Sequence, residues 1–333
     1  MATKQKNIDS IDLMKLLAAL AVVGIHTGLI DYLVDTLKSN VPEIISRMAV
    51  PLFFIASSFF LVKHLKKYSD YRAQVKKYLI RICQLYVFWL VLYGYFIIKN
   101  TLVGLHKGFN WSHFWVGTIN FILSGPRTGV VFWYLNATIF ACLFVFWWFY
   151  KKPKLGFCIA AIMFALTVWF SAYQPVNLGE IVLSATIFIG PIYFYVGWIA
   201  ERLYDNHLVL KWIPLIIVTL AIIALTFMEL HIVNRHFGHS DQLFIYPFLG
   251  LTLFMMTLKI RIKIPYAKFW RNMSTFLYLS NFLVLMSFRS LLDPMLTHNI
   301  VRYLTVVGLA IGFYVLTVFL QKSRFFKILR FAY

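Results

Sequence analysis

Long apolar runs, separated by short segments that carry basic residues, recur along the whole 333-residue chain. Hydrophobic residues make up 61% of the sequence and charged residues 13%, whereas soluble domains have about a quarter of their residues charged. A run of about 20 apolar residues is long enough to cross a bilayer as one helix. The pattern predicts an all-α, polytopic membrane helix bundle, and it excludes soluble, disordered and disulfide-rich secreted proteins.

The runs predict about ten transmembrane helices in one integral-membrane domain, residues 1–333. The expected spans are 11–30, 47–62, 80–98, 131–150, 155–171, 181–199, 212–229, 243–259, 273–289 and 302–320. Basic residues concentrate in the cytoplasmic segments of membrane proteins. With the N-terminus inside, 23 of the 32 basic residues fall in inner segments, so we expect both termini to be cytoplasmic.

The formal charge of +20 is explained by these loops and their contact with anionic membrane lipids. We therefore expect no nucleic-acid partner. The three cysteines lie in apolar segments without paired spacing, and HIVNRHFGH around His231 matches no tetrahedral ligand pattern. The sequence predicts no metal site.

The first span carries Asp12, Lys15 and His26, which is unusual because an ionisable group inside a bilayer costs several kcal/mol. His26 follows Lys15 by eleven positions, so the two lie on one face of the helix, about 16 Å apart along its axis. Lys15 could instead extend to the cytoplasmic interface, and His26 could be a packed histidine. A titratable imidazole on this face also suits proton transfer.

Arg47 is expected to open the second helix on the outer side, where Pro51 permits a kink and the guanidinium lies at the depth of His26. A permanent cation there suits an oxyanion, a carbonyl or a phosphate, or it anchors a lipid headgroup. Arg81 is expected to begin the third helix after the richest basic loop. That inner surface suits a phosphorylated ligand or lipid headgroups equally.

A second group is expected on the outer side, namely Trp133, Tyr134 and Asn136 of VFWYLNA, together with Glu180. An aromatic belt explains the first two, whereas Glu180 could orient His26. The segment 100–130 is too polar to span but rich in aromatic residues. We expect an interfacial helix or a re-entrant cap there.

At these residues the chain resembles the membrane acyltransferase family 3, ten-helix O-acyltransferases of bacterial polysaccharides and other glycans. The resemblance rests on a basic residue, ten intervening residues and a histidine, here Lys15 and His26. It also rests on four further blocks: Arg47 to Phe54, YLIRICQLYVFW around Arg81, FWYLNA around Tyr134, and GPIYFYVGWIAERL.

Two positions depart from the family pattern. Lys15 stands where arginine is usual, which removes the bidentate fork. In the block NMSTFLYLSNFLVL, Asn281 stands at the last place of a family pattern that often reads Tyr-Leu-x-His, and an amide cannot accept a proton.

The resemblance implies transfer of an acyl group, most simply acetyl from acetyl-CoA, to a hydroxyl of a glycan or lipid-linked saccharide in the bacterial cytoplasmic membrane. Under that hypothesis Lys15, Arg81 and Asp12 hold the donor, and it reaches His26 through a polar slot. His26 accepts the hydroxyl proton, while Arg47 and Tyr134 stabilise the developing negative charge. Direct transfer and an acyl-His26 intermediate both fit, because no serine or cysteine lies in an obvious nucleophile motif. The alternatives are a transporter or flippase and a structural scaffold. The first is favoured by a resemblance to membrane modules linked to vancomycin-type serine racemases.

Overall fold

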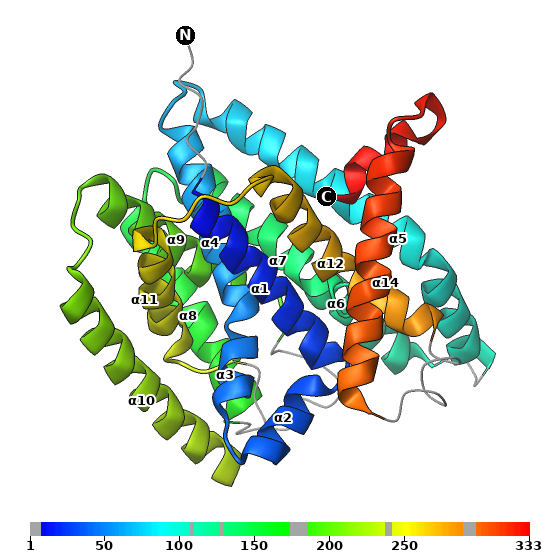
Figure 1. The fold of residues 1–333 in the computed structure, drawn as a ribbon, viewed down its shortest axis with the longest axis horizontal. Coiled ribbons are helices and arrows are strands. Elements are labelled where there is room, and N and C mark those ends of the chain that lie inside the picture. Colours follow the sequence, from blue (N-terminus) through cyan, green and yellow to red (C-terminus); the bar gives the residue numbers. More distant parts are fainter. Residues whose placement is uncertain (1–7, 107–109, 127–128, 174–184, 237–241, 289–297) are drawn as a thin grey trace.

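A computed structural model describes residues 8–106, 110–126, 129–173, 185–236, 242–288 and 298–333. Over these ranges the chain is helical and contains no strand, which confirms the predicted all-α class. The helices pack side by side as a bundle (Figure 1). In chain order they are α1 Asp9–His26, α2 Leu29–Leu37, α3 Val41–Arg47, α4 Ala49–Leu65, α5 Tyr71–His106, α6 Trp111–Ser124, α7 Phe132–Cys142, η1 Leu143–Trp148, α8 Pro153–Ala172, α9 Gly190–Asp205, α10 Trp212–His236, α11 Tyr246–Lys259, α12 Ala267–Ser287, α14 Asn299–Leu320 and η2 Arg324–Ala332.

Five helical segments in the described ranges are long and apolar enough to cross a membrane. They are Val41–Leu65, Tyr71–Val103, Pro153–Ala172, Trp212–Arg235 and Asn299–Leu320. The bent pair α1 and α2 is a sixth candidate if it counts as one span. The count of about ten spans and the cytoplasmic location of both termini stay predictions. Several of the other expected spans coincide with shorter helices, namely α7 with η1, α9 and α11.

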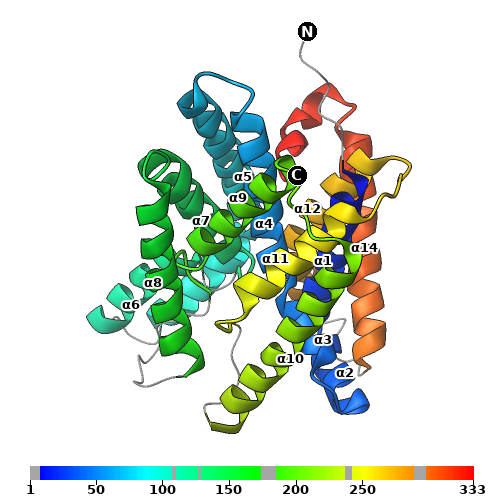
Figure 2. The ribbon, with the colours of Figure 1, turned by 90° about the vertical axis from the view of Figure 1, so that its left-hand side faces the viewer.

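Two contacts show the relative direction of α1 and α12. Asp12 and Arg271 pair near the beginnings of α1 and α12, and His26 and Phe282 touch near their ends, so the two helices run parallel. The predicted first and ninth spans also share a direction, because successive spans alternate and both of these are odd-numbered. The beginning of α1 and the C-terminal η2 lie at one end of the bundle, whereas α2 and α3 lie at the other (Figures 1 and 2).

The first helix is shorter than the predicted span 11–30. It ends at His26, and Gly28, with φ of 75°, turns the chain into α2. The two helix axes differ by 85°. Glycine adopts this left-handed conformation without a steric penalty, which explains why the break falls here. His26 therefore lies at a helix end.

Two other predicted boundaries also move. Arg47 does not open a helix, because α3 begins six residues earlier and Arg47 is its last residue, one residue before the interruption at Met48. Arg81 lies ten residues into α5, which begins at Tyr71. Within 100–130, where an interfacial helix or a re-entrant cap was expected, the structure has the helix α6, whose Trp111 and Trp115 are exposed.

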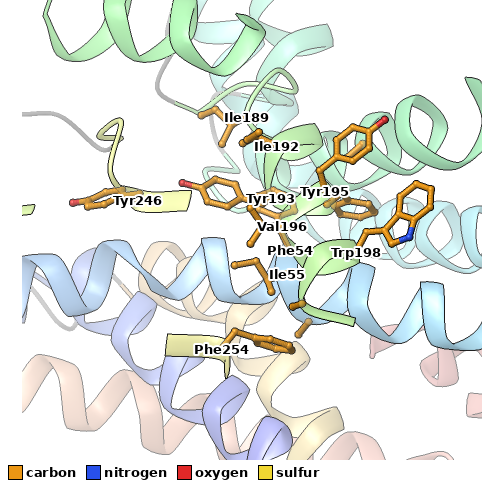
Figure 3. Close-up of a cluster of buried hydrophobic side chains, with 14 of the residues drawn as sticks. Phe54, Ile55, Ile189, Ile192, Tyr193, Tyr195, Val196, Trp198, Tyr246 and Phe254 are labelled. Atoms are coloured by element: carbon orange, nitrogen blue, oxygen red, sulfur yellow. The ribbon is translucent and has the colours of Figure 1, made fainter. Parts of the chain in front are cut away.

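The core of one half of the bundle lies between α4, α9 and α11. Phe54, Tyr193 and Phe254 are fully buried there, and Figure 3 shows these side chains gathered between the three helices. Gly197 is the point of closest approach, because a Cβ atom on it would lie 2.5 Å from the Ile55 carbonyl oxygen and 2.7 Å from Ser58 Cβ. The α4–α9 contact therefore requires a residue without a side chain at position 197.

We expect Gly197→Ala to lower the free energy of unfolding by about 1–3 kcal/mol, because the added methyl group overpacks this contact. Gly308→Ala in α14 is the matched control, since nothing lies within 4 Å of the place that a Cβ atom would take there. Thermal unfolding of the detergent-solubilised protein measures both variants. Equal melting temperatures for the two would contradict the close approach.

Lys66 joins the adjacent ends of α4 and α9. Its ammonium lies 2.8 Å from both the Glu201 and the Asp205 carboxylates. The hydrogen bond from Lys66 holds the pKa of Asp205 below its ordinary value of 3.8. A lowered pKa in the folded state means that the pair stabilises the fold above pH 3.8 and loses this effect as the pH falls through the lowered value.

The melting temperature of the wild-type protein should therefore be higher than that of Asp205→Asn at neutral pH. The difference should be small, because Asp205 is exposed and exposed ion pairs are screened. The margin should shrink as the pH is lowered below about 4. Melting curves over this pH range test the expectation. A margin that grows on acidification would show that the sign is wrong.

Candidate functional site

Charged residues gather around the beginnings of α1 and α12. Asp12 is 2% exposed, and its carboxylate lies 3.7 Å from the Arg271 guanidinium. Lys15 is half-buried one turn further along α1, and the charges that act on it are Asp12, Arg271 and Arg81. Asp9 is a second acid that acts on Asp12. The group therefore has three cations and two carboxylates, and its net charge is positive.

Aromatic rings continue from Lys15 toward the middle of the bundle. The Lys15 ammonium lies 5.8 Å from the centre of the Phe53 ring, a distance at which a cation is attracted to the ring face. Phe53 contacts Tyr134 and Tyr278, with ring centres 6.0 and 5.4 Å away. The rings of Tyr134 and Tyr278 are themselves 5.2 Å apart.

Hydroxyl groups accompany these rings. Ser57 Oγ lies 3.4 Å from the Tyr134 hydroxyl, and the Tyr78 hydroxyl also hydrogen-bonds Ser57. The three side chains come from α4, α7 and α5. They add polar groups to a level of the bundle that is otherwise aromatic.

The far end of α1 carries His26. Its imidazole is half-buried and meets Phe282 edge-on, with ring centres 5.5 Å apart. Arg47 lies on α3, which packs against α1, and its Nε atom is 4.0 Å from the carboxylate of the buried Glu43. Eleven residues of helix place His26 about 16 Å beyond Lys15.

We call Asp12, Lys15 and His26 of α1, with Arg271, Tyr278 and Phe282 of α12, the polar column. The α12 residues are spaced by seven and four, so they share one face of that helix. Asn281 is adjacent and 1% exposed, and its amide nitrogen donates to the Tyr278 carbonyl at 2.7 Å. The column joins the end with the basic loops to the end with α2 and α3.

The structure groups the predicted residues differently from the sequence. Asp12, Lys15 and Arg81 come together as expected, although Arg81 is exposed. Tyr134 was expected beside His26 and Arg47, but its ring contacts connect it through Phe53 to Lys15. The reason is that Tyr134 of α7 packs against α4 at Phe53 and Ser57, which lie further along the chain than Arg47. Glu180 lies outside the described residues.

Several contributors were not predicted from the sequence. They are Glu43, Phe53, Ser57, Tyr78, Arg271 and Tyr278. Glu43 precedes Arg47 by four residues, which is the spacing of an ion pair along a helix. Arg271 and Tyr278 are seven residues apart, a spacing that indicates one helix face. Nothing in the sequence indicated that Phe53 lies beneath Lys15, because this contact joins two helices.

A family model described as an acyltransferase domain matches residues 8–325, nearly the whole chain. The chain belongs to acyltransferase family 3. This membership supports acyltransferase activity, and together with the apolar helices it indicates a multi-pass membrane protein.

Two curated relatives, both from Enterococcus faecalis, are named amino-acid racemase. One is 24% identical over 322 residues, which cover 90% of this chain and 44% of the relative. The other is 25% identical over 218 residues, which cover 59% of this chain and 28% of the relative. The chain thus spans less than half the length of these relatives. No solved structure matches it.

Proposed function

We propose that this acyltransferase moves an acyl group, most simply acetyl, from acyl-CoA to a hydroxyl of a cell-surface polysaccharide or another glycan. The observation that carries the proposal is the polar column, which has a cationic group at one end and a half-buried imidazole at the other. We place the column in the bacterial cytoplasmic membrane, with the cationic end toward the cytoplasm. The acyl donor is made in that compartment and carries phosphates.

In this mechanism the cationic end receives the donor and His26 activates the acceptor. The neutral imidazole takes the proton of the acceptor hydroxyl as the oxygen attacks the thioester carbonyl carbon. The carbon–sulfur bond then breaks, and the imidazolium returns the proton to the leaving thiolate. Atoms and charges balance without another reactant.

The remaining residues have supporting roles. Arg47 supplies a permanent cation near the end of α1, which suits stabilisation of the tetrahedral oxyanion. Its pairing with Glu43 fixes the side chain of Arg47. Tyr134 lies nearer to Lys15, so we now place it along the path of the donor. Lys15 attracts the donor as a point charge, because an ammonium lacks the planar fork of arginine.

His26→Ala should abolish acyl transfer while leaving the melting temperature unchanged. Transfer of label from radioactive acetyl-CoA to a glycan acceptor measures the activity. His231→Ala is the matched control, because His231 is exposed on α10. Near-normal transfer by His26→Ala would exclude this histidine as the base.

Arg47→Lys should lower kcat by about 10²-fold, because the positive charge is kept but the planar guanidinium, which can donate two parallel hydrogen bonds, is lost. Expression and folding should persist, since a lysine can still pair with Glu43. Arg235→Lys serves as the control, because Arg235 is an exposed residue of α10. An unchanged kcat would remove Arg47 from the site.

A second candidate is transport of a small polar molecule such as an amino acid, or of a lipid-linked sugar. The names of the two relatives favour amino acids, and intramembrane charges also line transport pathways. Purified protein in liposomes separates the two functions. Substrate flux without consumption of acetyl-CoA supports transport, whereas label on the acceptor supports acyl transfer.

A further inference from the structure

A cavity lies between the loop that follows α9 and the loop that follows α11. Its volume is about 360 Å³, and its lining residues are Tyr204, Asp205, His207, Val209 and Arg261. Both loops lie at the end of the bundle where α1 begins (Figures 1 and 2). The cavity is therefore on the proposed cytoplasmic side and apart from the polar column.

The lining favours an anion. Arg261 contributes a guanidinium that can grip a phosphate with two parallel hydrogen bonds. Lys63 lies nearby, with its ammonium 5.1 Å from the centre of the Tyr204 ring, and it acts on the acids beside the cavity. His207 and the Tyr204 hydroxyl supply further hydrogen-bond donors.

Asp205 is the one lining residue that would repel an anion, and the buried carboxylate of Glu201 lies beside it on the same lysine, Lys66. Lys66 donates a hydrogen bond of 2.8 Å to Asp205 Oδ2. Lys66 and Lys63, at the end of α4, together balance the two carboxylates, which leaves the Arg261 guanidinium and the His207 ring available to a ligand.

The size of the cavity limits what can occupy it. The cavity opens to the surface, because Tyr204, Asp205, His207 and Arg261 are exposed. Its volume is near the lower bound of about 300 Å³ for ligand sites, which suits a phosphorylated fragment of an acyl-CoA. The long thioester arm of such a ligand would have to lie elsewhere.

The loop that carries Arg261 is fastened to the beginning of α1. The backbone N–H of Ile264 donates to Asp9 Oδ2 at 3.0 Å. Asp9 is three residues before Asp12, so one short loop connects the cavity to the cationic end of the polar column.

We propose that this cavity binds a phosphate group on the nucleotide part of the acyl donor. The inference rests on the proposed acyl transfer and assigns Tyr204, His207 and Arg261 to donor binding. An anionic lipid headgroup offers the same phosphate chemistry, and the experiment separates the two sources.

The test compares Arg261→Gln with Lys263→Gln, which removes an equal charge from the same loop outside the cavity. Calorimetry with adenosine 3′,5′-bisphosphate should show about tenfold weaker binding for Arg261→Gln, because a charge-assisted pair is lost, and little change for Lys263→Gln. In transfer assays, the KM for acetyl-CoA should rise in Arg261→Gln. The KM for acetyl-pantetheine, which lacks the nucleotide, should stay unchanged.

Three outcomes would overturn the inference: equal binding of the bisphosphate by wild type and Arg261→Gln, equal weakening in both variants, or an effect that disappears in nanodiscs without anionic lipid. The last would assign the cavity to a headgroup. The proposed function fails separately, if the wild type binds the bisphosphate through Arg261 but transfers no label from either donor. Conversely, label transfer with Arg261-independent binding would leave the function standing and remove the cavity from it.

Discussion

The pairing of Asp12 with Arg271 is the interaction on which the arrangement of the polar groups depends. A carboxylate that is 2% exposed inside a bundle requires a compensating charge, because an isolated buried ion is strongly unfavourable. Arg271 supplies that charge from α12 and so fixes the register in which α12 lies along α1. That register in turn determines that Phe282 meets His26 and that Tyr278 reaches Phe53 and Tyr134.

The sequence predicted those features that depend on one helix at a time. Apolar runs located the helices, and the eleven-residue spacing placed Lys15 and His26 on one face of α1. The sequence did not predict the contacts between helices, because these contacts depend on how distant segments pack. Tyr134 is the clearest case: its place after an outer segment indicated the level of His26, whereas packing against α4 places its ring against Phe53.

Helix ends were predicted less well for a similar reason. Apolar character continues past His26 through Leu29 and Ile30, so composition did not reveal the turn at Gly28. Arg47 is preceded by Val41 and Ile44, which extend its helix in the N-terminal direction. A hydrophobic run indicates where a membrane segment lies, but backbone geometry decides where the helix stops.

The rings between the two ends of the polar column have a consequence for the membrane as a barrier. The rings of Phe53, Tyr134 and Tyr278 contact one another in tilted or edge-on arrangements, with ring centres no more than 6.0 Å apart. Closely set aromatic surfaces resist wetting, and dewetted constrictions impede ions. A bundle with such a layer can carry ionisable groups on both sides of it without letting ions leak across the membrane.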